Sequence, residues 1–218
     1  MWLVHVYVSQ EFLSLTENNS FRTSQLTRSG GTLAVSLAER NVEENPKSKI
    51  IQMKSNKALE NIRDIFSIFH DGTIETWNGN HELLKLKIVC EYLAERIDKS
   101  YASFYVEFEK IEKIEFNPWM NPINQPQILF TSIVDIFQAT LEILSAEIEN
   151  EFVKITCNQH NLDFDYCGGT LLVKCENVKV FDEKNNKLTI DELDKVCNEY
   201  WNEVKEQTEK SIIEKERK

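Results

Sequence analysis

The stretch FHDGTIETWNGN, residues 69–80, marks the point where a helical pattern gives way to a sheet pattern. Before it, SNKALENIRDIFSIF (55–69) carries apolar residues at spacings of three and four, which predicts a helix with one buried stripe. We expect Ser55 to be the N-cap and Gly72 to help the chain change direction. From Thr73 onward the alternation has a period of two, which predicts a strand.

A hairpin should follow this strand. Asn78-Gly79-Asn80 is a strong tight-turn signal, and the alternating residues Leu84–Cys90 predict the partner strand. SYASFYVEFEKIEKIEF predicts the next strand, with a bulge or bend near Lys110 where its alternation slips. The proline-rich NPWMNPINQP (117–126) should be irregular.

The second half predicts more sheet and one long helix. Residues 131–150 fit either helix or strand, and we favour strand from about Leu141 onward. Thr189 and Glu192 form a capping box that predicts the start of a final helix, fading past Glu206. Four short strands lie between these segments, with turns at 158–161 and 167–169: 152–157, 162–167, 169–175 and 177–181.

These patterns predict an α+β fold, a mostly antiparallel meander with helices packed on one face. We expect a single domain over 1–218, with a variable N-terminal part (1–54), a helix and antiparallel sheet core (55–182) and a C-terminal helix (189–218). The first residues, MWLVHVYVSQEFL, lack the basic region and cleavage site of a signal sequence, so they predict a strand and a cytoplasmic protein. A long loop should follow over 16–31, TLAVSLAERNVEENP (32–46) could hold a short helix or strand that stops before Pro46, and KIIQM (49–53) could be a short strand.

Composition narrows the function. The formal charge is −11, from 36 acidic and 25 basic residues, which argues against a nucleic-acid ligand because phosphate binding needs a basic face. No apolar run approaches the roughly 18–20 residues that span a bilayer, so we expect no membrane partner. The five cysteines are irregularly spaced, which predicts free thiols, several of them buried.

The adjacent His70 and Asp71 have two interpretations. With His160 they could ligate the ion of a metal-dependent hydrolase, but His5 and His81 do not supply the rest of such a site. We favour a structural role, in which His70 donates to a free helix carbonyl and Asp71 accepts from amides of the turn.

Zinc is the second possible chemistry. Cys157, His160, Cys167 and Cys175 are suitable ligand types, but the Cys-x7-Cys half is far looser than a zinc knuckle. We therefore predict buried free thiols, with no metal and no cofactor.

Acidic residues suggest a docking face. A carboxylate pair could serve acid–base catalysis, and such residues are often only the solvated face of a sheet. A third interpretation, which we favour over catalysis, is a surface for a basic protein partner. The candidate contact residues are Glu107, Glu109 and Glu112, with Trp119 and Met120 as the apolar anchor.

The chain also resembles a group of small uncharacterised bacterial proteins. The resemblance rests on FHDGTIETW followed by LLKLKIVCEYL, FYVEFEKIEKIEFNPW, LEILSAEIENEFVKITC and GGTLLVKCENVKVFD, and covers about residues 66–182. Members typically have a Phe-His-Asp motif leading into an antiparallel sheet, and some resemble immunity proteins encoded beside polymorphic toxins. The resemblance implies a sheet-rich binding protein and carries no catalytic residues.

Together these observations predict a non-catalytic protein-binding module, an immunity-type inhibitor of a basic protein toxin. Two alternatives stay open: a metal-dependent hydrolase built around His70, Asp71 and His160, and an interaction subunit of a larger assembly. Neither the toxin nor the oligomeric state follows from the sequence.

Overall fold

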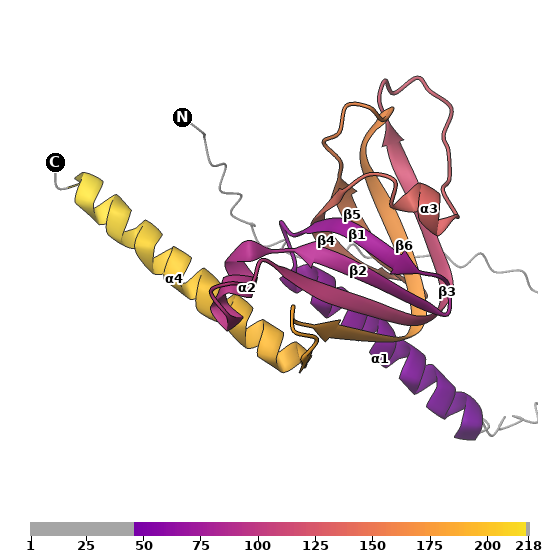
Figure 1. The fold of residues 1–218 in the computed structure, drawn as a ribbon, viewed down its shortest axis with the longest axis horizontal. Helices are drawn as coiled ribbons and strands as arrows, with labels where there is room; N and C mark the ends of the chain where they lie inside the picture. The colour runs from indigo at the N-terminus through magenta and orange to yellow at the C-terminus, as the bar shows by residue number, and fades with distance from the viewer. Residues whose placement is uncertain (1–45, 217–218) are drawn as a thin grey trace, which may run out of the picture. The chain divides into compact units, whose positions relative to one another are not determined.

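The fold is α+β, as predicted: a seven-strand antiparallel sheet with helix α1 (Pro46–Ile68) packed against it and a long C-terminal helix, α4 (Ile190–Glu216) (Figure 1). The structure is a computed structural model and describes residues 46–216. The strand expected at the start of the chain, the loop after it and the short helix or strand expected before Pro46 lie outside the described residues.

The sheet closes on itself. Its strand order is β3-β2-β1-β4-β5-β6-β7, and β3 pairs with β6 as well, so the first six strands of this order form a ring. Two short helices, α2 (Glu91–Ile97) and α3 (Ile133–Ile136), connect strands. The strands are β1 (Thr73–Gly79), β2 (Leu83–Val89), β3 (Ser103–Met120), β4 (Leu141–Glu149), β5 (Phe152–Asn158), β6 (Tyr166–Phe181) and β7 (Lys187–Leu188).

The core lies between α1 and the buried faces of the strands. The apolar stripe of α1 is buried as its spacing predicted, and Phe66 in the helix and Phe69 just after it pack on rings from β3. Phe66 stacks on Phe108 with 5.9 Å between ring centroids, and Phe69 lies 4.9 Å from Phe104. Each such side chain stabilises the fold by about 1.5–3 kcal/mol through burial alone.

The stretch that joins α1 to β1 is fixed to β4, the strand next to β1 in the ring. Asp71 has a φ of 65°, and its N–H donates to the carbonyl of Ile143 over 2.9 Å. The N–H of Ile143 donates to the carbonyl of Gly72 over 2.8 Å. A side chain at Gly72 would put a Cβ 2.9 Å from the carbonyl oxygen of Phe69, so glycine permits this close approach.

The predicted partners of His70 and Asp71 were wrong. The Nδ1 of His70 pairs with Oδ2 of Asp71 over 3.0 Å, and both side chains are about half exposed. The carbonyl of His70 accepts its hydrogen bond from the Tyr92 hydroxyl. The pair is held locally because the left-handed backbone of Asp71 turns its side chain back toward its neighbour.

Helix α1 is longer than the sequence suggested. It begins at Pro46, where the missing proline N–H costs nothing, so Ser55 lies inside the helix and is not its N-cap. The segment KIIQM belongs to α1 and is not a strand. Short apolar runs fit either period, and here the helix formers around this run decide the outcome.

The first hairpin has a wider turn than an Asn-Gly pair would give. Strand β1 continues to Gly79, whose φ of 120° is the expected positive value, and residues 80–82 form the loop. The Oδ1 of Asn80 accepts from the N–H of Glu82 over 2.8 Å, and the N–H of Asn80 donates to the carbonyl of Leu83. The expected irregularity at Lys110 is confirmed by a φ of 52° beside a register shift.

Strands β3 and β6 run through residues that we expected to break them. Pro118 lies in β3, where β2 no longer pairs along its other edge, so its missing N–H leaves the ladder intact. Gly168 and Gly169 lie inside β6, which includes both predicted strands 169–175 and 177–181. Of the predicted strand 162–167, only Tyr166 and Cys167 belong to β6, and residues 162–165 form a turn. A Cβ at Gly169 would lie 2.5 Å from the ring of Phe116, so the glycine makes room for that ring.

The starts of β4 and α4 agree with the predictions, and the end of α4 does not. Strand β4 begins at Leu141, as favoured. Glu192 accepts from the N–H and hydroxyl of Thr189, each over 2.8 Å, which confirms the capping box of α4. That helix does not fade past Glu206 but continues to Glu216. No described helix is both long and apolar enough to cross a membrane.

Candidate protein-binding surface

The acidic face predicted along β3 is largely neutralised by lysines. Glu107 lies 3.3 Å from the Nζ of Lys85, and Glu112 lies 3.0 Å from the Nζ of Lys174. Glu109 pairs with Lys179, which lowers the pKa of its carboxyl group. Lysines on neighbouring strands therefore already neutralise the negative charge of these three glutamates, which was expected to attract a basic partner.

The predicted apolar anchor lies elsewhere on the same strand. Trp119 is 41% exposed, whereas Met120 is only 6% exposed and belongs to the core. Ten residues of extended strand separate Trp119 from Glu109, which is roughly 33 Å. The five predicted contact residues therefore do not form one surface.

A different set of exposed apolar side chains gathers where β3 ends and β6 begins. The loop over residues 121–132 and the β5–β6 connection over 159–165 lie at this end, and the first of these loops leads to helix α3 beside β3 (Figure 1). We call the set the apolar tip. Its members, with exposed fractions, are Trp119 (41%), Ile123 (87%), Ile128 (46%), Leu129 (53%), Val134 (61%) and Leu162 (97%).

Aromatic packing supports the loops under the apolar tip. Phe130 forms a bridge with Phe116 of β3, and their rings stack at 6.3 Å. Tyr166 lies edge-on to both rings and also contacts Phe164 in the β5–β6 connection. The N–H of Asn121 donates to the carbonyl of Asp165 over 2.9 Å and joins the two loops directly. The exposed side chains therefore stand on an ordered base.

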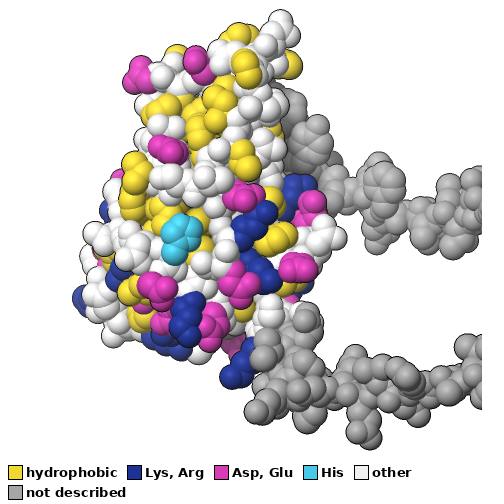
Figure 2. Space-filling view, turned by 90° about the vertical axis from the view of Figure 1, so that its right-hand side faces the viewer, with side chains coloured by type: hydrophobic (Ala, Val, Ile, Leu, Met, Phe, Trp, Pro, Cys, Tyr) yellow, Lys and Arg dark blue, Asp and Glu magenta, His cyan; other side chains and the backbone are white. Residues whose placement is uncertain are grey.

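The segments that carry the apolar tip contain no Lys or Arg. The sequence contains no Lys or Arg over residues 114–153 or 155–173. Asp135, Asp163 and Asp165 are exposed in or beside the tip loops. Figure 2 shows the same contrast on one face: hydrophobic side chains and a few acids occupy the upper part, while Lys and Arg gather lower down. The tip is thus an apolar surface with an acidic rim.

Sequence reasoning found one member of this surface and missed the rest. Trp119 was named, but Ile123 lay in a segment interpreted only as irregular, and Ile128 and Leu129 lay just after it, where no element was predicted. The signal that could have found them is the long run without Lys or Arg combined with apolar residues between prolines. Leu162 could not be assigned this way, because its place beside the other loop depends on the β3–β6 pairing.

The four candidate zinc ligands do not converge. Cys157 and Cys175 point into the core, where burial raises the pKa of each thiol to about 12 and keeps it protonated. Cys167 is exposed, eight residues along β6 from Cys175, a span of roughly 26 Å. His160 is exposed and pairs with Oε2 of Glu142 over 2.8 Å. The prediction that several cysteines are buried free thiols is confirmed.

The hydrolase alternative gains no support from the geometry. Over residues 46–216, no group of three or more His, Cys, Asp or Glu side chains is placed to hold a metal ion. His70 pairs with Asp71, while His160 pairs with Glu142 of β4. The three residues of the hypothetical site are therefore engaged in two separate ion pairs.

Comparison with known proteins adds no family. No protein-family model, no curated protein and no solved structure matches the chain. The resemblance to immunity-like bacterial proteins therefore stays a hypothesis.

Proposed function

We propose that this protein is a non-catalytic protein-binding module that binds a basic partner through the apolar tip. The observation that carries the proposal is a set of six exposed large apolar side chains on the end of β3, the loop and short helix that follow it and the β5–β6 connection, all in segments without Lys or Arg. Exposed apolar patches rimmed by polar groups are typical of protein-interaction sites.

The chemistry of the apolar tip suits such a contact. Trp119 is the type of residue that most often dominates binding energy, because a buried indole gives a large contact area. Ile123 and Leu162 project furthest into solvent and would be desolvated first. Asp135, Asp163 and Asp165 would attract a cationic partner and accelerate its association, since complementary charge mainly raises the association rate.

Within this proposal the partner is a basic toxin and the protein is its immunity-type inhibitor in the cytoplasm. Support comes from the net charge of −11 and from the resemblance to immunity-like sequences. A closed sheet with α1 packed against it is also a rigid base, which lowers the entropy that binding loops lose on association. The interaction-subunit alternative shares this surface and differs only in the partner.

The test compares two double variants that change exposed apolar residues at different places. Ile123→Asp/Leu162→Asp alters the apolar tip, and Ile212→Asp/Ile213→Asp alters exposed isoleucines on α4. The partner to use is the product of the gene next to this one, with calorimetry to measure Kd. We expect the tip variant to weaken binding by at least about 100-fold and the α4 variant by less than about threefold.

Two results would argue against the proposal. One is tight binding by the tip variant, and the other is equal weakening by both variants with unchanged melting curves. If the association rate does not fall as salt rises from about 0.05 to 0.5 M, the partner is not basic. Such a result would contradict the proposed attraction between the acidic residues of the tip and a cationic partner.

A further inference from the structure

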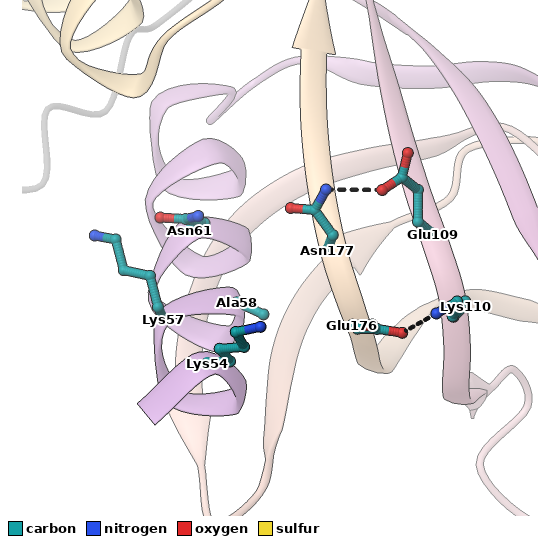
Figure 3. A pocket seen from close by; sticks show the side chains of 8 residues that line it. All are labelled: Lys54, Lys57, Ala58, Asn61, Glu109, Lys110, Glu176 and Asn177. Carbon is teal, nitrogen blue, oxygen red and sulfur yellow. Dashed lines mark hydrogen bonds and ion pairs between the residues drawn. The ribbon is translucent and has the colours of Figure 1, made fainter. Parts of the chain in front are cut away.

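A second surface, away from the apolar tip, follows from a gap in the strand pairing. On one side of β6, pairing with β5 ends at Val173 and pairing with β7 begins at Val180. Residues 174–179 therefore have no strand partner on that side among the described residues. Helix α1 lies beside this length of β6 (Figure 3).

Two adjoining hollows lie between α1 and this open strand edge. The first, of about 380 Å³, is lined from α1 by Lys54, Lys57, Ala58 and Asn61, and from the sheet by residues of β3 and β6 (Figure 3). The second, of about 310 Å³, extends to β7 and the first residues of α4. Lys57, Asn61 and Asn177 line both hollows, so the two form one groove.

The groove carries lysines that the protein itself does not neutralise. Lys110 and Lys179 are taken up by ion pairs with Glu176 and Glu109. In contrast, the structure gives Lys54 and Lys187 no ion pair with any described residue, and Lys57 reaches only Glu60, at 3.8 Å. Asp191 is the one carboxylate of the groove lining without an ion pair among the described residues. In a chain with a net charge of −11, this is a local cationic strip.

A buried polar atom also lacks a partner in the groove. The Oδ1 of Asn61 is buried and accepts no hydrogen bond from the described residues. Leaving a buried acceptor unsatisfied costs free energy, and an N–H group placed in the groove would remove that cost. Free anions such as sulfate or chloride carry no donor at neutral pH and monohydrogen phosphate carries a single O–H, whereas a peptide backbone has an N–H at almost every residue.

We infer that the groove binds an extended peptide segment rich in Asp or Glu, added as a strand along residues 174–179 of β6. The open edge supplies main-chain partners, as in other cases where a peptide extends a sheet. Alternate side chains of the segment point toward α1, where Lys54 and Lys57 meet carboxylates, and a backbone N–H reaches the Oδ1 of Asn61. This surface is independent of the apolar tip.

The experiment uses fluorescein-labelled eight-residue peptides and fluorescence anisotropy on the full chain. One probe alternates Glu and Thr, a second alternates Lys and Thr, and a third repeats the Glu-Thr probe with every second amide N-methylated. We expect the Glu-Thr probe to bind and each of the other two to bind at least about tenfold more weakly.

Variants locate the site. Lys54→Glu/Lys57→Glu should weaken the Glu-Thr probe by at least about tenfold, while Lys195→Glu/Lys210→Glu on exposed positions of α4 should change it by less than about twofold. Ile123→Asp/Leu162→Asp should bind the probe like wild type, which separates this surface from the proposed function. No binding at millimolar peptide, equal binding of the N-methylated probe, or equal weakening by both lysine pairs would overturn the inference.

Discussion

Asp71, the second residue of the His70-Asp71 pair, affects stability through its backbone conformation and through its side chain. Its backbone is left-handed, and its carboxylate pairs with a neighbouring imidazole. Asn and Asp tolerate a φ near 60° better than most residues, whereas a β-branched residue tolerates it poorly. An ion pair between half-exposed groups contributes only about 0–1 kcal/mol. The backbone is therefore the larger of the two effects.

Substitutions at this position separate the two contributions. Asp71→Asn keeps a residue that accepts the conformation, and we expect the free energy of unfolding to change by less than about 0.5 kcal/mol. Asp71→Val should lower it by about 1–2 kcal/mol, because valine is strained at this φ. Urea denaturation followed by fluorescence measures both. If the asparagine variant loses as much stability as the valine variant, the carboxylate is the dominant contribution.

The sequence captured residues whose role is local and missed those whose role depends on a distant strand. The positive φ of Gly79 and the capping box at Thr189 follow from neighbours within a few positions. Gly169 was interpreted as part of a turn. Its actual role is to leave space for the ring of Phe116, and that role could not be predicted because Phe116 lies more than fifty positions away in the sequence. Leu162 of the apolar tip was missed for the same reason, because its place depends on the pairing of β3 with β6.

At the scale of elements, one carboxylate joins the β6–β7 turn to the start of β3. Oε1 of Glu183 accepts from the backbone N–H groups of Ala102 and Ser103 and from the Ser103 hydroxyl, each over 2.8 Å. These donors, led by the N–H of Ala102, lower the pKa of Glu183 below its ordinary value of 4.5. Asp182, buried beside it, closes the turn by accepting from the N–H groups of Lys184 and Asn186.

This arrangement predicts a pH-dependent contribution to stability. Because the folded pKa lies below the unfolded one, the contribution is complete above about pH 4.5 and is lost as the pH falls through the folded pKa. Glu183→Gln should lower the free energy of unfolding by about 1–2 kcal/mol at pH 7. The difference from wild type should shrink below about pH 4, as urea titrations at several pH values will show. A difference that stays constant to about pH 3 would mean that the charge of Glu183 is not involved.

Helix α4 is tied to the rest of the described chain only by its first half. Arg96 of α2 forms two 2.6 Å hydrogen bonds with the carboxylate of Glu203, and Tyr200 lies 4.5 Å from the ring of Tyr92. Beyond Val204 the described side chains are exposed, and their hydrogen bonds and ion pairs stay within the helix. The capping box predicted where this helix begins. The apolar spacing of the sequence could not show that the helix continues well beyond the residues that contact the rest of the described chain.

For the whole molecule, we predict that the end of α4 can be removed without cost to the fold. Ending the chain after Gln207 should change the free energy of unfolding by less than about 0.5 kcal/mol, because exposed helix ends contribute little. Arg96→Ala, which breaks the tie to Glu203, is the contrasting change and should loosen α4 without unfolding the sheet. Circular dichroism with urea measures both. A truncated chain that melts cooperatively at a much lower temperature would show that the last residues are part of the folded unit.

The closed ring also determines the order in which the chain can fold. Hairpins β1–β2 and β4–β5 pair residues close in sequence, but the ring closes only when Tyr105 meets Phe181 along β3 and β6. Loop-closure entropy makes such distant pairings late and slow. Until β6 has been synthesised, the long edge of β3 is without its partner, and unpaired edges invite association with other chains. The time between these two strands emerging is therefore the period in which this protein is most exposed to aggregation.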